Sequence, residues 1–455
     1  MRHRTDRELD TPCRRRGTVL IVTIWVVLVL AGLALVFARS MRVAAIVSAN
    51  EVAALEAECL AAGALEYVKA KLVAAASAQS TTSDTSDSYK GMEVGTGYFW
   101  VLRSNLENDR EFDYGLTDEA GKINLNSASL EMLLKLPGMT SELAASIIDW
   151  RDTDSDVTTG GAEDEYYLLR PQPYHCKNAP LETVEEVLLI KGASPELLYG
   201  EDTNLNGVLD EHENDGDASA PADNRNGRLD AGFYDYVTVY SVEANVDGEG
   251  NARININTPA ARKELQTALQ EVASEDRALE IMNRVSTNAS YTSVIDFYFR
   301  AGLTYEEFEA IADRLTTSSA QTLTGLVNVK TASKEVLLCL PGLEESDVEA
   351  LLSYRSANTA LDSTAWVTKV LTREKATGIG SYITIRSSQY SADIIGASHN
   401  GRAYKRYKAV IDMQGASPRV VYWKALTDSG WPLDPQIVAT LRKGQPLTKA
   451  ILNAK

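Results

Sequence analysis

Residues 18–38 form an uninterrupted stretch, TVLIVTIWVVLVLAGLALVFA, of 21 residues without a charged side chain. At about 1.5 Å per residue, a helix over this stretch is roughly 30 Å long, which is the thickness of a bilayer's hydrocarbon core. Arginines at positions 14–16 precede it, and such residues stay on the cytoplasmic side of a membrane. A buried core helix is the alternative, but the length and the flanking charges favour one membrane-spanning helix.

The charge of the chain divides at this segment. The first 17 residues hold six arginines against three acidic residues, a net charge of +3, so the rest carries −21 of the total charge of −18. A body this acidic is a poor partner for nucleic acid, because affinity for phosphate depends on clustered Lys and Arg. The excess acid is compatible with cation binding or with solubility alone.

Gly17 stands between the arginines and the apolar stretch. An ordinary signal peptide has a shorter apolar region and ends in a small-x-small cleavage site, which is absent here. The order of basic leader, glycine and apolar helix resembles the prepilin signal, which is cut after the glycine. We therefore expect processing between Gly17 and Thr18, with the helix retained. Most pilin-like proteins carry Glu at the fifth mature position, where this chain has Val22.

The helix is expected to continue beyond the membrane. Residues 41–76 contain no proline and are rich in Ala, Leu, Glu and Lys, which are strong helix formers. One helix over residues 18–76 would be about 85 Å long, with a membrane part and a stalk. Apolar residues recur at helical spacing in the stalk and predict its packing face: Val52, Leu55, Leu60, Leu65 and Val68.

A repeat occupies the middle of the chain. Residues 123–151 (INLNSASLEMLLKLPGMTSELAASIIDWR) align without gaps with residues 327–355 (VNVKTASKEVLLCLPGLEESDVEALLSYR), and residues 253–261 (RININTPAA) are a partial third copy. Each full copy predicts two helices joined by a tight turn at Pro-Gly. The residues expected to face each other across the first hairpin are Leu133, Leu134, Ile147 and Ile148.

These copies resemble the helix-hairpin-helix module. In its DNA-binding form, a second glycine lets backbone N–H groups approach phosphate at a helix N-terminus. Thr140 and Glu344 occupy that place here, and Glu344, Glu345 and Asp347 would repel a nucleic-acid backbone. We interpret the repeats as helical packing units.

Residues 202–213 (DTNLNGVLDEHE) match the calcium-loop pattern at every demanded position. That chemistry needs oxygen ligands on alternate residues, a glycine for the sharp turn, here Gly207, and a closing acid. An Asn/Gly turn with solvated acids is the alternative. The expected ligands are Asp202, Asn204, Asn206, the Val208 carbonyl, Asp210 and Glu213.

The residues that follow are material for a second metal site. It lacks a closing acid, because Phe233 stands at the last position. Its candidate ligands are Asp215, Asp217, Asp223, Asn226 and Asp230.

Strand patterns flank the repeats. They cover residues 98–102, 112–116 and 236–246, and three further stretches lie between residues 381 and 426. Alternation through Tyr404, Arg406 and Lys408 predicts antiparallel strands with one face in water, and we expect both cations on that face.

No catalytic set is found in the sequence. The four histidines form no HExxH arrangement, no nucleophile elbow or phosphate loop is present, and none of the four cysteines stands in a CxxC pair. Asp149 and Asp152 flank Arg151, which we interpret as a salt link at a helix end. We therefore predict that the chain is not an enzyme.

Several motifs taken together resemble the type II secretion protein K family, the large minor pseudopilins. They are the leader with Val22, the INLNSAS and LPG motifs, GGAED at residues 160–164, the acidic loop, and RSSQYSAD at residues 386–393. The resemblance implies an α+β fold, in which a pilin-like N-terminal helix lies on a small antiparallel sheet that carries an inserted helical domain.

The family also implies a function. Calcium would bind the acidic loop, and the prepilin peptidase would cut the leader, leaving a methylated N-terminus. The protein would cross the inner membrane once, with its body in the periplasm, at the tip of the pseudopilus with minor pseudopilins I and J. There it would help to initiate assembly and the export of folded proteins, with the inner-membrane platform, cargo and the secretin as further partners. The alternatives are a membrane-anchored DNA-uptake protein and a calcium-dependent hydrolase.

The expected organisation has eight parts. The leader covers residues 1–17, the membrane and stalk helix 18–76, and the first strands 90–122. A helical domain with the first repeat (123–200), the acidic loop (201–232) and further strands (233–257) follow. The second repeat lies in a helical region (258–375), and antiparallel strands with a tail end the chain (376–455).

Overall fold

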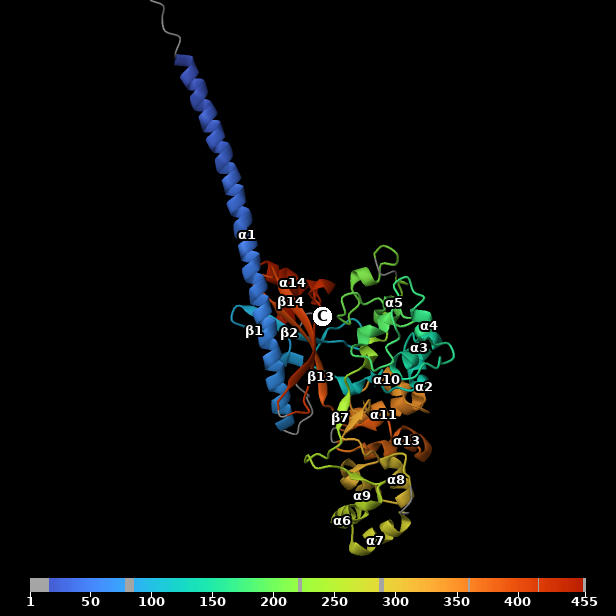
Figure 1. The fold of residues 1–455 in the computed structure, drawn as a ribbon. Helices are drawn as coiled ribbons and strands as arrows, with labels where there is room; N and C mark the ends of the chain where they lie inside the picture. The colour runs from blue at the N-terminus through green and yellow to red at the C-terminus, as the bar shows by residue number, and fades with distance from the viewer. Residues whose placement is uncertain are drawn as a thin grey trace, which may run out of the picture.

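The fold begins with a single long helix, α1 (Arg16–Ser77). The rest of the described chain lies to one side of its C-terminal half and beyond it (Figure 1). The computed structural model describes residues 16–77, 86–219, 223–285, 290–358, 361–415 and 417–452. Most of the predicted leader lies outside these residues, while Gly17 and Thr18 lie in the first turn of α1. The prediction of one continuous helix is confirmed.

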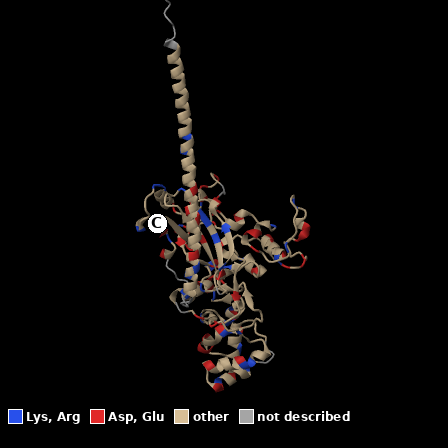
Figure 2. Ribbon diagram, turned by 60° about the vertical axis from the view of Figure 1, so that its left-hand side comes forward, with Lys and Arg blue, Asp and Glu red and all other residues tan. Residues whose placement is uncertain are grey.

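Among the described residues, the N-terminal half of α1 stands apart from the other elements (Figure 1). Its apolar side chains are exposed, including Val22 at 59% and Trp25 at 69%. By length and composition it is the one helix in the described ranges that is able to cross a membrane. Figure 2 shows that this half carries almost no charged side chains.

The C-terminal half of α1 packs on the sheet through small residues. Ala53, Ala57 and Ala61 are at most 2% exposed. A Cβ on Gly396 of the facing strand would lie 2.3 Å from the Ala57 carbonyl oxygen, so the close approach requires glycine there. The predicted packing face is partly wrong, because Val52 and Leu55 are each 65% exposed, while these alanines are buried.

The sheet is antiparallel and combines strands from both ends of the chain. Its order is β1-β2-β13-β14-β15, with β3 paired to β2 and β4 to β13. These strands are β1 (Met92–Val94), β2 (Gly97–Arg103), β3 (Asp113–Tyr114), β4 (Thr117–Asp118), β13 (Gln389–Ala397), β14 (Tyr404–Asp412) and β15 (Arg419–Ala425). Two helices in the expected C-terminal tail, α14 (Pro435–Arg442) and α15 (Lys449–Leu452), pack into the same core as α1 and the sheet.

A helical domain is inserted between β4 and β13 (Figure 1). It contains three modules, each held by a two-residue parallel strand pair. The pairs are β5 (Ile123–Asn124) with β6 (Val237–Thr238), β8 (Ile254–Asn255) with β9 (Leu315–Thr316), and β11 (Val327–Asn328) with β12 (Ile383–Thr384). The partial third copy therefore opens a complete module.

The helices of these modules are short and pack into one core. The first module holds α2 (Leu130–Leu134), α3 (Ser141–Arg151), α4 (Asp164–Tyr167) and α5 (Pro195–Tyr199). The middle module holds α6 (Arg262–Val272), α7 (Glu275–Arg284), α8 (Val294–Ala301) and α9 (Tyr305–Ile311). The last holds α10 (Lys334–Cys339), α11 (Glu345–Ala357), α12 (Val367–Val370) and α13 (Arg373–Ile379). The long stretch between residues 271 and 324 thus belongs to the middle module.

The two full repeats each form a pair of helices around the Pro-Gly turn. Gly138 and Gly342 have φ angles of 68° and 72°, a conformation that glycine adopts without strain. The side chain of Thr140 accepts a hydrogen bond from Leu143 N at the start of α3. At the start of α11, Glu344 N donates to Asp347 Oδ2 at 2.9 Å, so the second helix of each repeat begins with its own cap. Backbone donors that phosphate would need are thereby partly occupied.

Two local predictions in the first repeat are wrong. Leu133 and Ile147 are fully buried as expected, whereas Leu134 is 44% exposed, because α2 ends within one turn of it. The predicted salt link at the end of α3 is also absent, because the Arg151 guanidinium donates instead to the carbonyl oxygens of Leu125 and Ala128. The predicted fold class is nevertheless confirmed, with a long helix on an antiparallel sheet and an inserted helical domain.

Candidate metal centre

The acidic loop leaves the first module after α5 and returns before β6. Its base is closed by an antiparallel bridge between Gly200 and Ala231, and Glu201 N donates to the Asp230 carbonyl at 3.1 Å. Gly200 has φ of 66°, and a Cβ there would lie 2.0 Å from that carbonyl. The two arms of the loop are therefore held together at a position where only glycine fits.

Two buried carboxylates organise the first turn of the loop. The Asp202 carboxylate accepts hydrogen bonds from Asn206 N at 3.0 Å and Gly207 N at 2.9 Å. The Glu213 carboxylate accepts from Thr203 N at 2.9 Å and Asp210 N at 3.1 Å. These bonds explain why the loop needs acids at Asp202 and Glu213. They also explain the glycine at Gly207, whose φ is 71°.

The amide side chains complete the predicted set. Asn204 and Asn206 both donate from Nδ2 to Asp210 Oδ2, at 2.6 and 3.2 Å. Val208 N donates to Asn206 Oδ1 at 2.7 Å. The structure thus connects Asp202, Asn204, Asn206, Asp210 and Glu213 in one hydrogen-bonded network, called the ring below, in which Val208 N also takes part.

Because the acids of this ring are buried, keeping them ionised is unfavourable in free energy. Asp202 is 4% exposed and Glu213 is fully buried. Burial, followed by the charge of Glu213, raises the pKa of Asp202 to about 7, and burial likewise raises the pKa of Glu213. Asn204 Oδ1 is buried without a hydrogen-bond partner. The residues fit a hard cation, because such an ion would offset both carboxylates and give that oxygen a partner.

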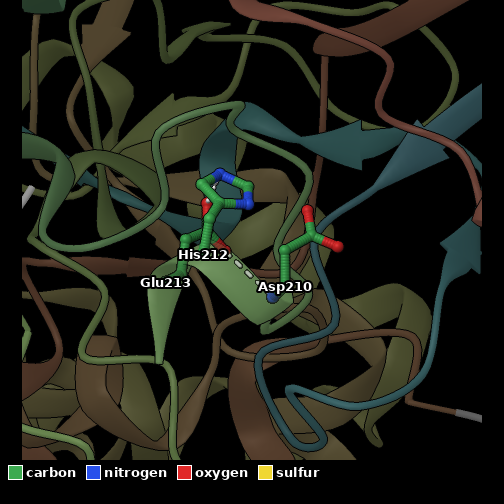
Figure 3. A group of neighbouring side chains, drawn as sticks. All are labelled: Asp210, His212 and Glu213. Atoms are coloured by element: carbon green, nitrogen blue, oxygen red, sulfur yellow. Dashed lines mark hydrogen bonds and ion pairs between the residues drawn. The ribbon is translucent and has the colours of Figure 1, made fainter. Parts of the chain in front are cut away.

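Figure 3 shows Asp210, His212 and Glu213 on one short turn. One possible ligand atom from each lies within 4.8 Å of the others. The His212 ring lies near Thr203 Oγ1, at 2.9 Å from Nε2, and is exposed. Since calcium prefers oxygen ligands, His212 is a neighbour of the ring and not an expected ligand.

Arg406 of β14 anchors the outside of the loop to the sheet. Its guanidinium donates to the carbonyl oxygens of Asn204 and Leu205, and it pairs with Asp393 at 2.6 Å. The side chain of Arg406 is fully buried, and Lys408 is half-buried. The prediction that both cations lie on a solvent-exposed face is therefore wrong, because the inserted domain covers that face of the strand.

The second predicted site repeats the backbone of the first. Leu205 and Arg225 have φ of 54° and 53°, and Gly207 and Gly227 have φ of 71° and 74°. Asn226 donates to Asp230 Oδ2 at 3.1 Å, as Asn206 does to Asp210. The signal in the sequence is a shared Asn-x-Asn-Gly-x-Leu-Asp pattern at residues 204–210 and 224–230.

The acids of the second site are not gathered in the same way. Asp223 Oδ2 accepts from the backbone of Asp215 and Gly216, and Asp217 is exposed. Two residues that the sequence analysis missed lie at this site. Asn224 donates to Asp230, and the Glu201 carboxylate, whose pKa is raised by burial and then by Asp230, accepts from Asp230 N at 3.2 Å.

Comparison with known proteins finds a similarity in the segment that precedes the acidic loop. The family model of type II secretion system (T2SS) protein K matches residues 113–199. The type II secretion system protein K of Klebsiella pneumoniae is 30% identical over 105 residues, which cover 19% of this chain and only 32% of that relative's length.

A solved structure is also similar. It is the crystal structure of the GspK-GspI-GspJ complex from the enterotoxigenic Escherichia coli Type 2 Secretion System, with a TM-score of 0.37 and 12% identity, covering 80% of this chain and 95% of that one. The match of residues 113–199 and the similarity to the Klebsiella protein confirm the resemblance predicted from the sequence: in these parts the chain is similar to type II secretion system protein K.

Proposed function

We propose that this chain is a minor pseudopilin of a type II secretion system, at the tip of the pseudopilus. The observation that carries the proposal is α1, whose exposed apolar half precedes a half packed on an antiparallel sheet. Such a helix anchors a subunit in the inner membrane and presents a folded body on one side of it. In this position the body would be periplasmic, and the subunit would help to initiate assembly and export of folded proteins.

The composition of the membrane part fits a terminal position. In pilin assembly, the Glu of the fifth mature position is expected to pair with the N-terminal amine of a neighbouring subunit. Val22 occupies that position and offers no such carboxylate. A subunit with no neighbour above it would otherwise carry an unpaired charge in lipid, which is costly. Cleavage by the prepilin peptidase between Gly17 and Thr18, followed by methylation, is part of the same proposal.

The partners we propose are minor pseudopilins I and J. The similar Escherichia coli chain was solved in a complex of three Gsp proteins, and we extend that composition to this chain as a hypothesis. Val52 and Leu55, each 65% exposed, extend the apolar surface of α1 beyond the membrane part. Exposed apolar side chains at helical spacing suit packing against another helix. The platform, cargo and secretin are further proposed partners.

We propose calcium as the ion of the loop over residues 202–213. Its ring supplies carboxylate and amide oxygens and a glycine turn, which is the ligand chemistry that calcium prefers. A bound cation would fix the loop against Arg406 of the sheet, and so hold the helical domain to the pilin-like part.

The association test uses the full chain in detergent, mixed with pseudopilins I and J. We expect a stable complex with the wild type and its loss in Val52→Asp and Leu55→Asp, because a charge would be buried in an apolar contact. Glu51→Gln, at an exposed neighbouring position, is the matched control and should behave like the wild type. Failure of the wild type to associate would contradict the proposed function, and unchanged complexes in both Asp variants would exclude this surface.

A further inference from the structure

A small cavity lies where the inserted helical domain covers the sheet, and none of its lining residues belongs to the acidic loop. Strands β14 and β15 line it with Lys408 and Tyr422. The inserted domain and the segment that enters it contribute two carboxylates, Glu119 and Glu185, and the hydroxyl of Tyr240. A ligand in this cavity would therefore contact both parts of the fold.

The first of these carboxylates is occupied by protein donors. Glu185 Oε1 accepts hydrogen bonds from Lys424 Nζ at 2.8 Å, from the Tyr422 hydroxyl at 3.0 Å and from the Tyr234 hydroxyl at 3.2 Å. Two of the tyrosine hydroxyls in the wall have thus donated their hydrogens to one oxygen.

The second carboxylate belongs to a buried ion pair. Glu119 accepts from Lys122 Nζ at 2.9 Å and also from the hydroxyl of Thr238. Glu119 is 3% exposed and Lys122 is 7% exposed, so the pair is removed from water and neutralises itself. The acids of the cavity wall are therefore already bonded to other groups.

Two polar groups of the wall have no hydrogen-bond partner among the described residues. The hydroxyl oxygen of Tyr240 is buried and unpaired. The ammonium of Lys408 lies 4.3 Å from the centre of the Tyr234 ring, and it forms no hydrogen bond or ion pair with the described part of the chain. Both groups carry hydrogens that they are able to donate. A buried donor without an acceptor is unfavourable, so the wall has donors left over.

The charges around Lys408 point in the same direction. Burial, followed by the charge of Lys122, lowers the pKa of Lys408. The acids that oppose this effect are Asp235, Glu119 and Asp393, and none of them forms an ion pair with Lys408 within the described residues. Two of these acids are already paired with other cations. The ammonium therefore lacks a negative group at contact distance.

We propose that this cavity holds a small inorganic anion, chloride, between Lys408 Nζ and Tyr240 Oη. An anion only accepts hydrogen bonds, whereas a water molecule would bring two hydrogens that need acceptors of their own. The ion would also neutralise an ammonium that is held away from bulk water. It would join β14 to the segment that follows β6, and this role depends neither on secretion nor on calcium.

Melting temperatures of the full chain in detergent are measured in sodium chloride and in sodium gluconate, at equal ionic strength and constant calcium. We expect chloride to raise the melting temperature of the wild type by about 2–4 °C, because the ion binds the folded state. Tyr240→Phe should lose this rise, because it removes one donor and keeps the ring that packs against Tyr422. Lys408→Met should lose the rise as well.

Tyr422→Phe is the matched control. It removes a hydroxyl that lines the same cavity but is bonded to Glu185, so the chloride-induced rise should remain. A wild type without a rise would overturn the proposal, as would rises in Tyr240→Phe and Lys408→Met equal to that of the wild type.

Crystals grown in sodium bromide give a second readout, which needs no variant to fold. We expect an anomalous peak in contact with Lys408 Nζ and Tyr240 Oη, because bromide replaces chloride and scatters anomalously. Density at this place without an anomalous signal would identify water and overturn the proposal.

Discussion

The two halves of the acidic loop share a backbone and differ in how their acids are placed. Both contain Asn-x-Asn-Gly-x-Leu-Asp, with left-handed residues at the same positions and amides directed at Asp210 or Asp230. Glu213 closes the first half from within, whereas Phe233 stands at the equivalent place and is buried in the core. We therefore expect that a common turn alone does not define an ion site, and that the closing carboxylate decides the ligand set.

The halves also differ in their anchors. The first is held by Arg406, whose side chain is fully buried between Asp393 and the loop carbonyls. The second is held by Arg110, which donates to the Gly227 carbonyl at 3.0 Å in an exposed contact. We expect the first half to bind calcium and to couple the helical domain to the sheet, and the second half to contribute little to either.

The largest expected effect tests the anchors. Arg406→Met leaves Asp393 half-buried without its partner and should lower the free energy of unfolding by about 3–5 kcal/mol, measured by denaturant unfolding. Arg110→Met is the matched control and should cost less than about 1 kcal/mol. Replacing both partners in Arg406→Met/Asp393→Leu should recover part of the loss. Equal losses of unfolding free energy in Arg406→Met and Arg110→Met would contradict the proposed difference between the two halves.

The next effect concerns pH in the absence of metal. The folded-state pKa of Asp202 is about 7, above its ordinary value, so the folded state binds the proton more tightly. The cost of ionising Asp202 in the folded state is therefore absent below about pH 4 and complete above about pH 7, a change of roughly 4 kcal/mol in the free energy of unfolding. Thermal melts in chelator should show stability falling over this range, and Asp202→Asn should flatten the curve. A profile that is unchanged in Asp202→Asn would contradict the assignment.

A smaller effect is expected from the closing acid. At a calcium concentration about 100-fold above the dissociation constant, one site stabilises the fold by about 2.7 kcal/mol. Glu213→Gln should lose this increment in melts with and without calcium, because it removes the carboxylate that we propose as the closing ligand. Glu211→Gln, at an exposed position two residues away, should keep it. A full calcium-induced rise in Glu213→Gln would move the ion elsewhere.

The smallest effect belongs to the second half. Asp230→Asn should change the calcium-induced stabilisation by less than about 0.5 kcal/mol, because its neighbouring acids are directed at backbone donors. A loss as large as that of Glu213→Gln would show that the second half is a site of its own, completed by Glu201.

The sequence predicted features that depend on neighbouring residues. The membrane helix follows from an uncharged run, and the first ligand set follows from a short pattern whose members contact one another in the structure. The three modules were predicted only in part, since the middle one keeps the opening Arg-Ile-Asn-Ile-Asn but not the Leu-Pro-Gly turn.

Contacts between residues far apart in the sequence could not be predicted from the sequence. Arg406 lies 202 residues from Asn204 in the sequence, so strand alternation alone did not show that an inserted domain covers it. The acids at the end of α3 were predicted to form a salt link with Arg151. The structure shows Arg151 donating to two carbonyl oxygens instead, and these contacts depend on the tertiary fold, which the local sequence does not reveal. In the stalk, large apolar residues were favoured over the alanines that allow close packing on Gly396.

Anomalous diffraction from crystals grown with calcium tests the comparison most directly. We predict a calcium peak enclosed by Asp202, Asp210 and Glu213, and no peak of comparable height between Asn224 and Asp230. A peak in the second half with none in the first would contradict the account, because it would show that the shared turn, and not the closing carboxylate, selects the ion.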